Sequence, residues 1–120
     1  MHAPVLGVST VSSPGIAVVT AAGEIDLDTA SQLREALAGC LVEAPAWIRV
    51  DLREVGFCDC SGLNVLLWAR ARAMEIGIRL GVVAAAGSIV LRVLQLTGTD
   101  RLLLEEDQWH RRQTGQPLNR

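Results

Sequence analysis

The fold of this chain is decided by the sequence VDLREVGFCDCSGLNVLL, which occupies residues 50–67. Its first part continues a strand-like apolar run over residues 47–52. A short link leads to a polar turn over residues 59–62, and a helical pattern begins directly after that turn. Apolar residues there recur at the spacing that places them on one helix face. This predicted inward face consists of Leu63, Leu66, Leu67, Ala71 and Met74.

The polar turn has the chemistry of a helix N-terminus. Asp59 and Ser61 carry side-chain oxygens that can accept hydrogen bonds from the free backbone N–H groups of a first helical turn. Those donors and the positive end of the helix dipole favour negative charge at this place. A hydroxyl or thiol in the turn would be accessible, and a phosphate added there would be stabilised locally. The turn is therefore the best candidate for a functional site.

Ahead of this stretch the pattern predicts two strands and a helix. A β-like centre over residues 5–8 predicts an edge strand, and the β-branched run 16–20 is typical of a buried strand. The helix that follows has Asp28 or Thr29 as its N-cap, in a capping-box pattern, and Pro45 beyond its end. Its predicted inward face consists of Ala30, Leu33, Leu37, Cys40 and Leu41.

Behind this stretch, strands and helices continue to alternate. Gly77 ends the central helix, and residues 78–84 predict a buried strand. Another helix runs between a Ser88 cap and Gly98, and residues 102–104 predict a last short strand. The inward face of that helix is predicted as Ile89, Val90, Val93, Leu94 and Thr97. The alternation argues for an α/β fold with right-handed crossovers.

Length and composition fit one domain. The chain has 120 residues, of which 50% are hydrophobic, enough to build a core. We expect a domain over residues 1–106 with its core at about 14–104, followed by a flexible, mildly basic tail over 107–120. The formal charge of −2 gives no electrostatic reason to expect a nucleic-acid partner.

The same composition indicates a cytoplasmic protein. No apolar run approaches the ~20 residues that a membrane span needs, and the N-terminus lacks the basic and apolar regions of a signal peptide. We therefore expect no membrane partner. Three cysteines, an odd number, fit a reducing compartment better than a disulfide framework.

Three pieces of sequence resemble the STAS family, the domain of bacterial anti-sigma factor antagonists. They are GEID at residues 23–26, DCSGL at 59–63 and VLRVLQLTG at 90–98, in the family's order and at its separations. The resemblance covers about residues 14–104. It implies a single STAS-like domain, a small mixed β-sheet with helices packed on it, and a phosphorylation turn at the start of the second main helix.

The chain departs from the family pattern at one position. In the pattern Asp-Ser-[Ser/Thr]-Gly the first serine is the one usually phosphorylated, and here that place is Cys60. Ser61 is the only hydroxyl left in the turn. Either Ser61 is phosphorylated by a kinase adapted to that register, or the protein is insensitive to phosphorylation and binds constitutively. The second outcome is favoured, because Cys60 keeps the size of a serine without its phosphate acceptor.

By the same resemblance, this region contacts an anti-sigma factor of the serine-kinase type. Carboxylates grouped at the strand end and the turn would receive basic groups from the partner. The residues predicted for this contact are Glu24, Asp26, Asp59, Cys60, Ser61, Gly62, Leu63 and Asn64. Val65 and Trp68 lie off the inward stripe of the helix and would extend the contact as an exposed apolar patch. Alternatively, both are buried because the helix crosses the sheet closely.

The sequence gives little evidence for an enzyme, a metal site or a bound cofactor. A nucleophilic Ser61 or Cys60 needs a positioned base, but the two histidines, His2 and His110, lie in the terminal segments. Cys58 and Cys60 supply two thiolates where zinc needs about four ligands, and both phosphate-binding glycine motifs are absent. We expect no catalytic residue, no metal and no cofactor.

The sequence therefore predicts a cytoplasmic anti-sigma factor antagonist that binds a serine-kinase-type anti-sigma factor and so releases a sigma factor. Two alternatives stay open. The chain could be a STAS module of another signalling assembly, stressosome-like or phosphatase-linked, or a small thiol redox sensor that uses Cys58 and Cys60. Formation of a homodimer is also left open.

Overall fold

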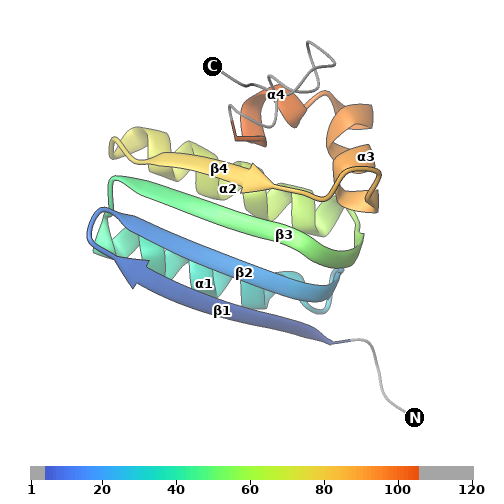
Figure 1. The fold of residues 1–120 in the computed structure, drawn as a ribbon, viewed down its shortest axis with the longest axis horizontal. Coiled ribbons are helices and arrows are strands. Elements are labelled where there is room, and N and C mark those ends of the chain that lie inside the picture. The colour runs from blue at the N-terminus through green and yellow to red at the C-terminus, as the bar shows by residue number, and fades with distance from the viewer. Residues whose placement is uncertain (1–4, 106–120) are drawn as a thin grey trace.

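A four-stranded mixed sheet organises the chain in the computed structural model, which describes residues 5–105 (Figure 1). The strands are β1 (Leu6–Ser13), β2 (Ile16–Ile25), β3 (Trp47–Cys58) and β4 (Arg79–Val83). The helices are α1 (Ala30–Glu43), α2 (Cys60–Glu75), α3 (Ile89–Thr97) and α4 (Asp100–Leu103). The predicted α/β fold with a small mixed sheet is confirmed, whereas the predicted tail over 107–120 lies outside the described residues.

The sheet order is β1-β2-β3-β4. β1 and β2 form an antiparallel hairpin through a turn at Gly15, whose φ of 83° suits glycine. β2 pairs with β3, and β3 with β4, in parallel. In Figure 1, α1 and α2 lie behind the sheet, α3 lies past the carboxyl end of β4, near the end of β3, and α4 lies beyond the β4 edge. Among residues 5–105 no helix is long and apolar enough to span a membrane.

β2 and β3 are longer than the sequence predicted. β2 continues past Thr20 to Ile25, and β3 runs without the expected link as far as Cys58. β2 is paired on both sides. Its register with β3 shifts at two places, Thr20/Ala22 and Gly23/Glu24, and the two strands remain paired after each shift. Pairing on two sides thus holds residues of low β-propensity, such as Ala22 and Gly23, in an extended conformation.

The core lies between the sheet and the pair α1 and α2. Alternate residues of the central strands face these helices, as the two-residue period of a strand requires. They are Ala17, Val19 and Ala21 of β2 and Ile48, Val50 and Leu52 of β3. The predicted inward face of α1 is confirmed, with Ala30, Leu33, Leu37 and Cys40 buried and Leu41 half-buried.

The predicted inward face of α2 is wrong in part. Ala71 and Met74 are exposed, and Met74 keeps 60% of its surface. The buried stripe is rotated and consists of Gly62, Leu63, Val65, Leu66, Ala69 and Ala73. Small residues at positions 69 and 73 let the helix approach its neighbours closely, a contact that a search for large apolar residues does not find.

This rotation corrects the predicted apolar patch on α2. Val65 is only 7% exposed, so its side chain belongs to the core. Trp68 is half-buried and packs against the core, and the Arg34 guanidinium of α1 lies 4.0 Å from the centre of its ring. The indole thus joins α1 to α2 and offers only part of its surface to a partner.

The C-terminal elements also differ from the prediction. Residues 102–104 do not form a strand, because α4 extends through Leu103 and only Leu104 makes a bridge, to Val82. A short apolar run does not distinguish a strand from a buried helical turn. In α3, the Ser88 and Gly98 caps are confirmed. Its inward face is confirmed at Val90 and Leu94, whereas Val93 is half-buried, Ile89 and Thr97 are exposed, and Leu91 is buried.

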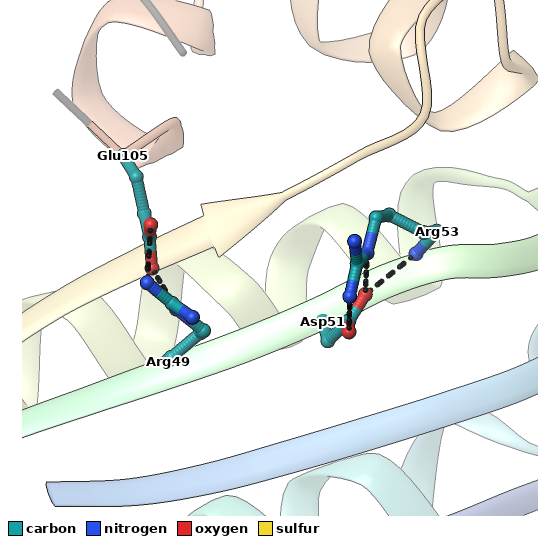
Figure 2. Close-up of polar contacts among 4 residues, drawn as sticks. All are labelled: Arg49, Asp51, Arg53 and Glu105. Carbon is teal, nitrogen blue, oxygen red and sulfur yellow. Dashed lines mark hydrogen bonds and ion pairs between the residues drawn. The ribbon is translucent and has the colours of Figure 1, made fainter. Parts of the chain in front are cut away.

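The face of the sheet opposite α1 and α2 carries ion pairs (Figure 2). Arg49 alternates with the inward-facing residues of β3 and binds Glu105 at 2.6 Å. Asp51 accepts two hydrogen bonds from the Arg53 side chain, at 3.0 and 2.8 Å. These bonds lower the pKa of the Asp51 carboxyl below its ordinary value. These charged groups therefore lie on the face of the sheet that α1 and α2 leave uncovered.

We predict that Trp68→Ala lowers the free energy of unfolding by about 1–3 kcal/mol, because the ring loses buried area and its contact with Arg34. Urea unfolding of Trp68→Ala, Arg34→Ala and the double variant should show a coupling of about 0.5–1 kcal/mol. An unchanged unfolding midpoint in Trp68→Ala would mean that Trp68 is a surface residue, as the sequence alone predicted.

Candidate functional site

The predicted turn forms the N-terminus of α2. Asp59 is the N-cap, and its Oδ1 accepts a hydrogen bond from the backbone N–H of Ser61 at 2.8 Å. Its own N–H donates to the carbonyl of Ile25 at 3.2 Å. The predicted cap is confirmed for Asp59, and the turn is tied by its backbone to the end of β2.

Gly62 permits the close approach of this turn to the strand ends. A Cβ at this position would lie 2.6 Å from Cys58 Sγ and 2.7 Å from Ile25 Cγ2, closer than side chains tolerate. Both neighbours are buried residues at the ends of paired strands. Glycine is therefore required here by space rather than by its backbone angles.

A second turn closes the end of β2. Asp26 Oδ1 accepts hydrogen bonds from the backbone N–H groups of Asp28 and Thr29, at 2.9 and 3.1 Å. The buried Thr29 hydroxyl donates to the carbonyl of Glu24 at 2.8 Å and accepts from the N–H of Asp26 at 2.9 Å. Thr29 occupies the N-cap of α1 without a side-chain capping bond. The predicted capping box is therefore wrong, because Thr29 is engaged by the preceding strand.

The two turns lie side by side, because Ile25 pairs with Cys58 and Glu24 with Phe57. Cys60 and Asn64 are exposed, and Glu24, Asp26, Asp59 and Ser61 are half-buried. Gly62, Leu63 and Val65 are buried, so their side of the helix supports the turn and presents little to a partner. The structure thus brings together the predicted carboxylates, the thiol and the serine.

Two apolar side chains at this place were missed by the sequence analysis. Leu27 is 81% exposed between Asp26 and Asp28, and Phe57 is 42% exposed opposite Glu24. A single leucine between two aspartates was a usable signal. We call the combined surface the α2 N-terminal face, formed by Glu24, Asp26, Leu27, Phe57, Asp59, Cys60, Ser61 and Asn64.

The cysteines beside this face have different surroundings. Cys58 is 4% exposed. Burial, followed by the negative charge of Asp59, raises the pKa of its thiol to about 11. Cys60 is exposed on the first turn of α2. Because Cys58 stays protonated near neutral pH, it lacks the thiolate that a reactive pair would need.

No group of three or more His, Cys, Asp and Glu side chains that could hold a metal ion is present within residues 5–105. The face combines negative charge, two exposed apolar side chains and a helix N-terminus, which are features that suit contact with a partner. The fold and this face define a small α/β domain with a surface suited to binding.

The chain belongs to the STAS domain family, since the family described as "Mlab, STAS domain" matches residues 9–105. It is 37% identical over 87 residues to the anti-sigma-F factor antagonist RsfB of Mycobacterium tuberculosis, covering 72% of this chain and 70% of the relative. The anti-sigma-B factor antagonist of Listeria monocytogenes is 33% identical over 86 residues, with 68% and 71% covered. The predicted family is confirmed, and with these relatives the chain is a regulatory binding protein and not an enzyme.

Solved structures agree with this assignment. An anti-sigma factor antagonist from Mycobacterium paratuberculosis superposes with a TM-score of 0.71 at 30% identity, over 82% of each chain. The unphosphorylated anti-sigma factor antagonist SpoIIAA superposes with a TM-score of 0.70 over 94% of this chain and all of its own. At 19% identity that second likeness concerns the fold alone.

Stability should fall at high pH through Cys58. Below about pH 8.5, the ordinary pKa of a cysteine thiol, both folded and unfolded chains keep this proton. As the pH rises toward about 11, the unfolded chain loses the proton while the folded chain keeps it. We predict that this linkage removes up to about 3 kcal/mol from the free energy of unfolding.

The measurement is urea unfolding across that pH range, beside Cys58→Ala as the control. The variant is less stable at neutral pH because it loses core volume, but its stability should fall less between pH values near 8.5 and 11. Parallel pH profiles for the two proteins would contradict a raised pKa at Cys58.

Proposed function

We propose that this chain is an anti-sigma factor antagonist that binds an anti-sigma factor of the serine-kinase type through the α2 N-terminal face and so releases a sigma factor. The antagonist names of the relatives support the class. One structural observation supports the place: the α2 N-cap is bonded to the end of β2, so the segment that carries Glu24 and Asp26 adjoins the turn that carries Asp59 and the exposed Cys60.

The carboxylates of this face suit basic partner groups. Within residues 5–105, the N–H groups of Asp28, Thr29 and Ser61 and the Thr29 hydroxyl bond to the carboxylates of Asp26 and Asp59 at Oδ1. Oδ2 of each aspartate can therefore accept a bond from an arginine or lysine of the partner. Leu27 and Phe57 add apolar area beside the charges, as interfaces commonly combine an apolar centre with a polar rim.

Regulation of this face would differ from the usual phosphorylation switch. A phosphate in the turn would add a charge of about −1.5 to −2 next to Asp59, and it would repel any acidic partner group that lies close to the turn itself. The exposed residue at the usual serine position is the thiol of Cys60, which cannot be an ordinary serine phosphosite.

Ser61 is a poor substitute for that serine. It is half-buried, and one residue along a helix rotates a side chain by roughly 100°. Phosphoryl transfer depends on in-line geometry, so this rotation would misplace the hydroxyl. We therefore propose that binding is constitutive, with Cys60 holding the shape of the unphosphorylated serine.

The test begins with capture of the anti-sigma kinase from native cell extract on the immobilised protein. The captured kinase is then incubated with ATP and either the parent protein or Cys60→Ser, and intact masses are measured. We predict that Cys60→Ser gains one phosphate at position 60 and then loses affinity for the kinase. The parent should gain little phosphate and stay bound.

Ser61→Ala is the matched control, because it removes the neighbouring hydroxyl and leaves Cys60 in place. Stoichiometric phosphorylation of the parent that Ser61→Ala abolishes would make Ser61 the switch and end the constitutive hypothesis. If the immobilised parent protein, in which Glu24 and Asp26 are intact, captures no protein of the serine-kinase type, the proposed function itself is contradicted.

A further inference from the structure

The outer edge of β1 is open. β1 ends the sheet and pairs only with β2, and Figure 1 shows no element of residues 5–105 along its other side. In an antiparallel strand, every second residue directs its backbone N–H and C=O groups away from the neighbouring strand. Half of the eight residues of β1 therefore present unpaired backbone groups along this edge.

The opposite edge of the sheet is covered by the chain itself. Leu104 makes a parallel bridge to Val82, and the N–H of Glu105 donates to the carbonyl of Val82 at 3.0 Å. Figure 2 shows the Glu105 carboxylate held by Arg49, with bonds of 2.6 and 3.1 Å. The two edges therefore differ, and only β1 is left without a neighbour among the described residues.

β1 also lacks the features by which edge strands resist pairing, which include charged side chains, proline and bulges. Its sequence, LGVSTVSS, contains no charge and no proline. Its register with β2 runs without a shift from Leu6–Gly23 to Ser13–Ile16. Ser9 and Thr10 are exposed, and Val11 is 65% exposed. The edge is regular and uncharged, which favours the addition of another strand.

We propose that β1 pairs antiparallel with β1 of a second copy of this chain, so that two sheets join into one of eight strands. A twofold axis perpendicular to the sheet makes identical strands antiparallel and keeps the helices of both copies on one side. With the axis at Thr10, Ser9 of each copy lies opposite Val11 of the other. Such uncharged cross-strand pairs stabilise the junction.

This dimer goes beyond the proposed function and has a consequence for it. The α2 N-terminal face lies at the carboxyl ends of β2 and β3. Because the twofold axis reverses the strand direction, the two faces would lie at opposite ends of the joined sheet. Both would remain accessible, so the dimer would be a bivalent binder whose apparent affinity for a clustered partner exceeds that of one face.

The test variant carries Ser9→Lys and Val11→Lys. Whether the axis passes through Ser9 or through Thr10, these substitutions place lysines directly opposite each other, which disfavours pairing. Both positions are exposed, so the fold should survive, and circular dichroism checks it. In sedimentation equilibrium from micromolar to millimolar concentration, the parent should reach twice the chain mass of 12.9 kDa, and the variant should lose the dimer.

Met74→Lys with Leu96→Lys is the matched control, because these side chains are 60% and 79% exposed and the charge change is the same. It should dimerise like the parent. A parent that stays monomeric, or a Ser9/Val11 variant that still dimerises, would overturn the proposal. Hydrogen exchange adds a second readout. Protection of the β1 amides that point away from β2, if it increases with concentration, supports pairing between copies, whereas protection of these same amides in the monomer means that the edge is covered within the chain and overturns it.

Discussion

The candidate functional surface depends on the close approach of the α2 N-terminus to the ends of β2 and β3. Gly62 leaves no room for a side chain against Cys58 and Ile25, and the N–H of Asp59 bonds to the carbonyl of Ile25. This contact fixes where the helix begins. It also directs Cys60 outward and sets the carboxylates of the β2 end beside it, so that the functional surface follows from one packing constraint.

The same contact makes the face rigid before a partner arrives. The side chains of Asp26, Thr29 and Asp59 hold both turns by accepting hydrogen bonds from backbone N–H groups, each contributing about 0.5–1.5 kcal/mol. A surface that is already ordered loses little conformational entropy on binding. A phosphate at position 60 would therefore add its charge to a surface whose carboxylates are already held in place. The thiol of Cys60 leaves the charge of that surface unchanged.

Local chemistry was predictable from the sequence, and packing was not. The Asp59 cap and the helix that follows it depend on neighbouring residues and were predicted correctly, whereas the strand that precedes them was predicted too short. The rotated stripe of α2 depends on how closely Ala69 and Ala73 approach other elements, which no apolar periodicity reveals. Phe57 was missed for a related reason, since its exposure is decided by the pairing of β2 with β3, whereas Leu27 between two aspartates could have been recognised from the sequence.

The central claim is that the α2 N-terminal face is the surface that meets the anti-sigma factor. Nuclear magnetic resonance tests it directly, by adding the unlabelled kinase-type anti-sigma factor to the isotope-labelled chain and mapping the amide signals that shift or broaden. The account predicts that the changes concentrate at residues 24–28 and 57–64. Changes concentrated instead around Val42, Trp68 and Ile76, which line a groove on α1 and α2, with the turn at Asp59 unaffected, would contradict it.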